Sequence, residues 1–244
     1  RGHVYLWRYS PSTPAHIITP RRKNNHGIMN HWELSASFDL YTTIFWSVTY
    51  IECIRIGLQK KTYCVPFFAI CMNMAWETLS LIDYLNHDGT DAALYFTYAV
   101  WMLLDIGIVC TYLLYGKKEL KAFLSSWGIQ DYTHVNKLFI ARTLFGFAVV
   151  IGVILYLYFN VVSWKGYFSF IDNLIMSALF IGMFFLRRGG NSQSLSIAIT
   201  KCIGTLCATI TMILGGNTTL WIIGVFCFII DIVYICIILH SKRM

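Results

Sequence analysis

The feature that most constrains this chain is a series of seven apolar runs, each about as long as a membrane-crossing helix. An α-helix needs about 20 consecutive apolar residues to cross the hydrocarbon core of a bilayer. Short polar connections separate the runs, so little of the chain is left for a second domain. The pattern predicts an all-α protein, a seven-helix transmembrane bundle, with spans at 38–58, 63–84, 93–115, 138–159, 165–186, 194–214 and 219–240.

The composition supports a membrane protein and argues against several other classes. Hydrophobic residues make up 57% of the chain and charged residues only 13%, whereas a soluble domain is about one quarter charged. The basic residues outside the first 28 are scattered over short loops, so no nucleic-acid partner is expected. Most of the eight cysteines fall inside apolar runs and form no CxxC motif, which indicates buried thiols rather than disulfides or a zinc site.

Basic residues in the short connections indicate how the bundle lies in the membrane. Lys and Arg concentrate in cytoplasmic loops. One set of alternate connections carries many basic residues, and the other set carries only Lys165 together with Asp83, Asp88 and Asp91. The basic set consists of Arg55, Lys60, Lys61, Lys117, Lys118, Lys121, Lys137, Arg187, Arg188, Lys242 and Arg243. We therefore expect a cytoplasmic C-terminus in a multi-pass protein of a bacterial plasma membrane or the endoplasmic reticulum.

The first 28 residues do not fit this orientation. They carry five basic side chains and no acid, on the side predicted to be external. Met29 begins a mildly acidic segment that obeys the charge rule. We expect residues 1–28 to be a leader or an added segment and residues 29–244 to be a single seven-span domain. A genuine basic arm is the alternative.

Eight acidic or basic side chains fall more than two residues inside the predicted spans, where each costs about 2.5–3.5 kcal/mol on insertion scales and usually faces a cavity or a partner. The eight are Glu52, Arg55, Glu77, Asp105, Arg142, Asp172, Lys201 and Asp231. Glu52, Arg55, Arg142 and Lys201 are predicted near the cytoplasmic end, where their mixed charges favour ion pairs between helices. Glu77, Asp105 and Asp231 are predicted near the middle, without a cation at that depth.

Burial and neighbouring like charges both favour the neutral form of a carboxyl group. At least one of the three middle acids should therefore carry a proton, and it could donate that proton into an apolar cavity. A simpler alternative for each is a protonated acid hydrogen-bonded to a neighbouring helix.

Aromatic side chains accompany these acids at helical spacing. They are Trp76 beside Glu77, Tyr98 and Trp101 on the same face as Asp105, and Tyr234 three residues after Asp231. Asn73 also shares a helix face with Glu77, since the two are four residues apart. Aromatic rings attract cations by about 0.5–2 kcal/mol. An acid that creates a carbocation and rings that shelter it would form a coherent site.

Several common membrane or terpenoid sites find little support in the sequence. No histidine lies well inside a span, which argues against a bis-histidine haem. The last span has no lysine for a retinal Schiff base, and Lys201 lies one span too early. The chain contains no DDxxD, NSE-type or DxDD motif, so metal-dependent diphosphate chemistry is poorly supported.

Four short motifs carry a resemblance to a known family. They are NMAWE at 73–77, WMLLD at 101–105, LRRGGNSQSLSIAITKCIGTL at 186–206 and FIIDIVY at 228–234. In their order and spacing they resemble the integral-membrane terpene cyclases of meroterpenoid and indole-diterpene pathways, which occur in fungi and bacteria. The resemblance covers about residues 40–240.

The resemblance implies a seven-helix enzyme that cyclises a prenyl chain, commonly one ending in an epoxide, without a metal or other cofactor. The two acids essential in that family fall on Glu77 and Asp231, which we take as the catalytic residues and expect to meet across a dry cavity. The candidates for binding substrate or stabilising cations are Asn73, Trp76, Tyr98, Trp101, Asp105 and Tyr234. Supporting candidates are Asp172, Asn173, Arg188 and Lys201.

These observations predict protonation-initiated cyclisation of a lipophilic prenyl or epoxy-prenyl substrate dissolved in the membrane lipid. A small proton-coupled transporter is the main alternative, because acids inside membrane spans fit that function as well. A seven-helix receptor would be supported only by the number of spans.

Overall fold

A computed structural model describes residues 31–86, 92–160, 164–187 and 192–242 of the chain. These residues form seven helices and, within those ranges, no strand, which confirms the predicted all-helical fold. The helices are α1 (His31–Lys60), α2 (Phe67–Asn86), α3 (Ala92–Ser126), α4 (Val135–Asn160), α5 (Trp164–Leu186), α6 (Leu195–Leu214) and α7 (Thr218–Ser241). Residues 1–28 and Arg188 lie outside the described ranges.

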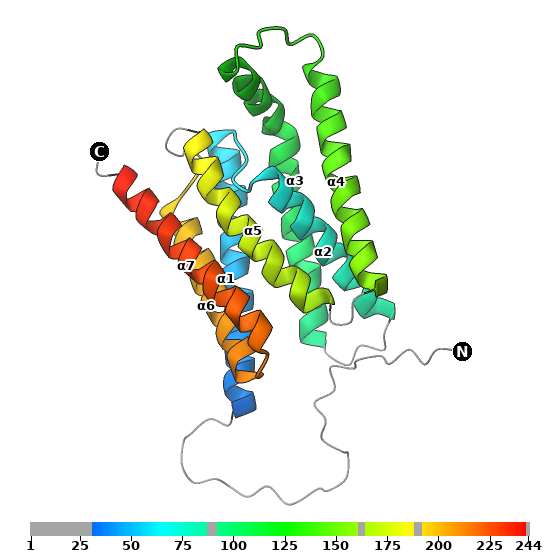
Figure 1. The fold of residues 1–244 in the computed structure, drawn as a ribbon, viewed down its shortest axis with the longest axis vertical. Helices are drawn as coiled ribbons and strands as arrows, with labels where there is room; N and C mark the ends of the chain where they lie inside the picture. Colours follow the sequence, from blue (N-terminus) through cyan, green and yellow to red (C-terminus); the bar gives the residue numbers. More distant parts are fainter. Residues whose placement is uncertain (1–30, 87–91, 161–163, 188–191, 243–244) are drawn as a thin grey trace, which may run out of the picture.

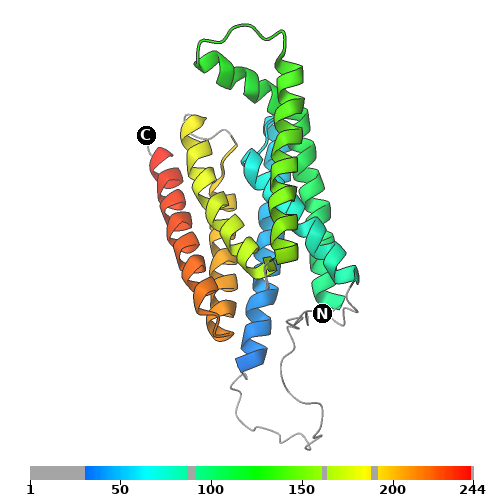
Figure 2. The ribbon, with the colours of Figure 1, turned by 45° about the vertical axis from the view of Figure 1, so that its right-hand side comes forward.

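The helices fall into two groups with α5 between them (Figure 1). On one side α6 packs against both α1 and α7, and on the other side α2 packs against α3 and α4. The groups are joined because α1 also contacts α3, and α5 contacts both α7 and α2. The last turns of α3 and the first turns of α4 project beyond the other helices, at the end where α3 connects to α4 (Figure 2). The space between the two groups is therefore bordered by α1, α2, α3, α5 and α6.

Five of the described helices, α3 to α7, are long and apolar enough to cross a membrane. Helix α1 has the lowest average hydrophobicity of the seven described helices, because it carries several polar and charged side chains. The structure thus supports a multi-pass membrane protein. Seven crossings and a cytoplasmic C-terminus stay predictions.

The distribution of side chains is the reverse of that in a soluble protein. Large apolar side chains on α4 point outward, and Leu144, Phe145 and Phe159 are each about two-thirds exposed or more. Charged side chains such as Glu77 and Lys201 are almost fully buried. Lipid solvates the outer surface of such a bundle, and ionisable groups are kept inside, where they find partners.

A small residue lets α1 approach α6 closely. A Cβ atom on Gly204 would lie 2.9 Å from Cδ1 of the Trp46 ring, which is closer than a side chain normally comes. Small residues at helix interfaces permit such approach in membrane bundles. The absence of a side chain at Gly204 therefore leaves room for the Trp46 ring in its present position.

Candidate active site

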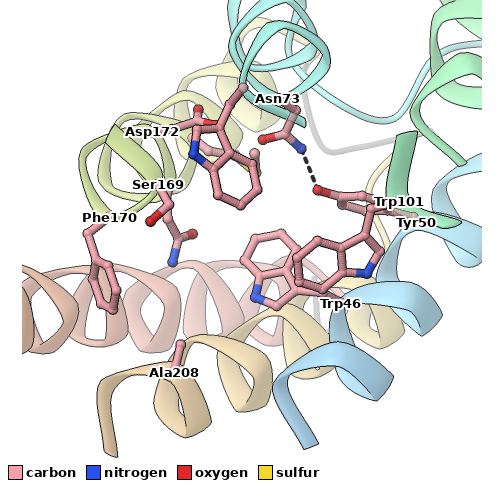
Figure 3. A pocket seen from close by; sticks show the side chains of 11 residues that line it. Trp46, Tyr50, Asn73, Trp101, Ser169, Phe170, Asp172 and Ala208 are labelled. Carbon is pink, nitrogen blue, oxygen red and sulfur yellow. Dashed lines mark hydrogen bonds between the residues drawn. The ribbon is translucent and has the colours of Figure 1, made fainter. Parts of the chain in front are cut away.

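A cavity of about 120 Å³ lies between the two groups of helices. Five helices contribute to its wall, and Figure 3 shows their side chains around a central space. The lining consists of Trp46, Tyr50, Asn73, Trp76, Trp101, Ser169, Phe170, Asp172, Asn173, Met176 and Ala208. Five of the eleven lining residues are aromatic and four are polar or acidic.

The aromatic side chains form a connected set of rings. The ring of Tyr50 packs against Trp46 at 5.8 Å and against Trp101 at 6.5 Å between centroids. Tyr98 contacts Trp101 at 6.4 Å and Trp76 at 5.5 Å, but it is not part of the lining. The Trp101 indole donates a hydrogen bond to Ser47 Oγ at 3.1 Å. These contacts hold the rings in a fixed arrangement around the cavity.

A pair of buried acids lies behind one wall of the cavity. Glu77 of α2 is 0% exposed, and its carboxyl lies within hydrogen-bond reach of Asp105 of α3. Two ionised carboxylates have no proton to share, so this contact becomes a hydrogen bond only when one of them is protonated. Like charges this close cannot both ionise readily. The pair can therefore hold one proton away from water.

Tyr50 and Asn73 connect this acid pair to the cavity. The Tyr50 hydroxyl donates a hydrogen bond to Glu77 Oε1 at 3.0 Å. The Asn73 amide in turn donates to the Tyr50 oxygen at 2.7 Å, the bond drawn in Figure 3. Both Tyr50 and Asn73 belong to the lining. The Glu77 carboxyl is thus one hydrogen bond away from a side chain of the cavity wall.

A buried ion pair lies behind another part of the wall. The Lys201 ammonium donates to Asp231 Oδ1 at 2.8 Å and Oδ2 at 3.1 Å, and both side chains are only 1% exposed. Thr205 also donates to Asp231 Oδ2, at 3.1 Å. Lys201 further donates to Ser177 and, at 2.8 Å, to Asn173 Oδ1. Because Asn173 lines the cavity, this network reaches the wall through its amide.

The prediction that the middle acids have no cation at their depth was wrong for Asp231. The backbone of Lys201 lies on α6, nearer the predicted cytoplasmic end, but its long flexible side chain brings the ammonium to the Asp231 carboxylate. Of the other residues predicted at that end, Glu52 and Arg55 form an ion pair at 2.6 Å, but both lie on α1, so this pair does not join two helices. Arg142 instead stacks over the ring of Phe67 at 4.6 Å.

The expectation that the two catalytic candidates themselves face the cavity was also wrong. Neither Glu77 nor Asp231 belongs to the lining. Each reaches it through partners, Glu77 through Tyr50 and Asp231 through Lys201 and Asn173. The two networks therefore reach the same cavity through different lining residues, and neither candidate contacts it directly.

The other candidates divide between the wall and its surroundings. Asn73, Trp76, Trp101, Asp172 and Asn173 line the cavity. Tyr98 and Asp105 lie one contact behind it. Tyr234 packs against Phe180 at 5.6 Å, and its hydroxyl has no hydrogen-bond partner among the described residues.

Asp172 supplies the one carboxyl of the lining within the described part of the chain. It is 3% exposed, and its Oδ1 has no hydrogen-bond partner among the described residues. It interacts electrostatically with Asp105 of one network and with Lys201 of the other. Asp172 therefore adds a polar group to the wall between the two networks.

Sequence reasoning missed three aromatic side chains of the wall, Trp46, Tyr50 and Phe170. Trp46 and Tyr50 are four residues apart on α1, a spacing that places two residues on one helix face. The same spacing had identified the aromatic residues of α3. Acids stand out in an apolar run by their charge, but none of the acids predicted near the middle of the membrane lies on α1, so no charge marks the face that carries Trp46 and Tyr50.

Comparison with known proteins agrees with the resemblance found in the sequence. The sequence profile of Pyr4-like transmembrane terpene cyclases matches residues 24–244. The Pyr4-family terpene cyclase mfmH of Annulohypoxylon moriforme is 23% identical over 197 residues, which cover 80% of this chain and 77% of that protein. The terpene cyclase ascF of Acremonium egyptiacum is 30% identical over 76 residues, or 31% of this chain and 26% of that protein.

A third relative matches over a similar length. The terpene cyclase esdpB of Penicillium shearii is 34% identical over 74 residues, which cover 30% of this chain and 29% of that protein. No solved structure is significantly similar to the chain. The family profile spans all seven described helices. The chain therefore belongs to the Pyr4-like transmembrane terpene cyclases.

Proposed function

We propose that this terpene cyclase closes rings by acid-initiated, metal-independent carbocation chemistry on a prenyl or epoxy-prenyl chain that enters from the membrane. The observation that carries the proposal is an aromatic cavity with a buried carboxyl pair one hydrogen bond behind its wall. Protonation of an epoxide oxygen or a terminal alkene creates an electron-poor carbon. The π electrons of the next double bond attack that carbon and form a ring.

Glu77 is the better initiating acid of the two catalytic candidates. The Asp231 carboxylate accepts hydrogen bonds from Lys201 and Thr205 on its two oxygens, so both oxygens are already used as acceptors within the ion-pair network. Glu77 instead shares a buried site with Asp105 and can hold a proton. In this scheme Asp231 fixes Lys201, and Lys201 fixes the Asn173 amide in the wall.

The aromatic wall suits the later steps of the reaction. Trp46, Tyr50, Trp76 and Trp101 present rings to the cavity, and rings stabilise nearby cations when water is excluded. A fixed wall also folds the flexible chain into a reactive conformation. Exclusion of water prevents early capture of the cation. Loss of a proton from the final cation balances the proton added at the start, so the whole reaction would be an isomerisation, and return of that proton to the Glu77–Asp105 pair through the side chains of the wall would restore the acid.

The test is conversion in membranes that contain the full chain. The probes are aromatic compounds carrying an epoxide-terminated prenyl chain, analysed by mass spectrometry and NMR. We expect cyclised products with the mass of the substrate, formed equally well in the presence of EDTA. Membranes without the protein serve as the control. Failure to convert any epoxide, or conversion that stops when EDTA is added, would contradict the proposal.

Substitution of Gly204 by alanine should impair cyclisation by moving a wall residue. The new methyl group would meet the Trp46 ring at 2.9 Å, so the ring must shift, and Trp46 lines the cavity. Small displacements of positioning groups can cost up to about 100-fold in rate, and we expect about a tenfold fall in kcat/KM. Gly152→Ala is the matched control, since nothing lies near its Cβ position. Equal activity of both variants would show that the Trp46 position is unimportant.

A further inference from the structure

We propose that Tyr50 is a catalytic residue that carries the proton from Glu77 to the substrate. This inference rests on the proposed function and supplies a step that it lacks. Glu77 is fully buried and does not line the cavity, so it cannot touch a substrate there. Tyr50 lines the cavity and also hydrogen-bonds Glu77 at 3.0 Å.

The partners of the Tyr50 hydroxyl define what that group can do. A phenol has one proton to donate and an oxygen that can accept. In the structure its proton goes to Glu77 Oε1, and its oxygen accepts from the Asn73 amide. The side chain of Asn73 also hydrogen-bonds Asp105. The N–H groups of Asn73 therefore point toward the oxygens of Tyr50 and Asp105. An amide nitrogen that donates in this way cannot accept a proton from Tyr50.

Protonation of Glu77 changes this arrangement. A neutral Glu77 can donate its own proton to the Tyr50 oxygen. The Tyr50 proton then no longer points at Glu77 and needs another acceptor. The amide nitrogen of Asn73 offers no acceptor, and the neighbouring Trp46 and Trp101 present rings. The open direction for the Tyr50 proton is the cavity. A protonated Glu77 therefore turns the Tyr50 hydroxyl into a donor aimed at the bound substrate.

The proton transfer balances without another reactant. The Glu77 O–H bond breaks as a new Tyr50 O–H bond forms, and the original Tyr50 O–H bond breaks as the epoxide oxygen is protonated. The epoxide C–O bond then opens, and π electrons of the prenyl chain form the first ring bond. Tyr50 stays neutral before and after, and Glu77 is left as the carboxylate, to which Tyr50 again donates, as in the structure.

Replacement of Tyr50 by phenylalanine tests this step, because it removes the hydroxyl and keeps the ring. With an epoxide probe that the wild type converts, we expect kcat to fall at least about 100-fold, the scale of a lost acid–base step. KM should change by less than about threefold, since a transition-state interaction is lost rather than binding. Tyr156→Phe is the matched control, because Tyr156 is exposed on α4.

A second measurement separates proton transfer from a structural role. Fluorotyrosine at position 50 keeps the hydroxyl and both hydrogen bonds but makes the phenol more acidic. A relay predicts that this substitution changes kcat. It also predicts that kcat depends on the fraction of D2O along a curved line, as expected when two protons move in one step. An unchanged kcat with fluorotyrosine, or Tyr50→Phe turning over like the wild type, would overturn the relay. If Glu77→Gln also kept full activity, the proposed function itself would fail.

Discussion

Replacement of Glu77 by glutamine is expected to lower turnover of an epoxide substrate at least about 100-fold. Glutamine has nearly the same shape and can still accept the hydrogen bond from Tyr50, which the Glu77 carboxyl accepts at 3.0 Å. It has no acidic proton to pass on. The measurement is kcat for isobaric product in membranes, with insertion of the variant verified by extraction as a monodisperse protein.

The same substitution should not weaken the fold. It removes one carboxyl from a buried pair with Asp105, and an amide can donate to the remaining carboxylate. Loss of activity with an unchanged or higher Tm would therefore identify a chemical role. Glu52→Gln is the matched control, because Glu52 pairs with the half-exposed Arg55 and lies outside the cavity lining. Wild-type turnover by a properly inserted Glu77→Gln protein would defeat the assignment.

Replacement of Asp231 by asparagine is expected to abolish turnover and also to destabilise the bundle. The Lys201 ammonium is 1% exposed and bonded to both oxygens of Asp231. Removing one partner of a buried ion pair typically costs about 3–5 kcal/mol, because the other charge is left uncompensated. Thermal unfolding in detergent or nanodiscs should show a large fall in Tm, in parallel with the fall in product.

A double variant separates these two effects. In Asp231→Asn with Lys201→Met, no buried charge is left unpaired, and replacing a buried ion pair by groups of similar size is often neutral. We expect most of the lost Tm to return. Turnover should stay low, since Lys201 no longer holds Asn173 in the cavity wall. Full recovery of turnover together with stability would mean that the ion pair serves only the fold.

Hydropathy was sufficient to locate most of the helices but not their full lengths. The predicted span 194–214 agrees with α6 (Leu195–Leu214), and 219–240 agrees with α7 (Thr218–Ser241). The span predicted at 93–115 ends eleven residues before α3 does, at Ser126. Residues past the apolar run are charged but still good helix formers, and a helix does not have to end where its apolar run ends.

The site was predictable only where a single residue was unusual in its own context. A carboxyl in an apolar run is unusual, so Glu77, Asp105, Asp172 and Asp231 could be identified from sequence. Which acid has a cation partner depends on how far Lys201 reaches between α6 and α7, and no spacing along the chain gives that. Tyrosine is common in membrane helices. The importance of Tyr50 therefore emerged only from its contacts with Asn73 and Glu77.

The small size of the chamber has a consequence for how the enzyme meets its substrate. At about 120 Å³ it is well below the roughly 300–1,000 Å³ of typical ligand pockets. A prenyl chain with several isoprene units needs more room than this, which a separation of the α1–α6–α7 group from the α2–α3–α4 group would supply. Such a separation would displace the surrounding lipid. Stiff, tightly ordered bilayers should thus oppose loading, and the fluidity of the host membrane becomes part of the enzyme's working environment.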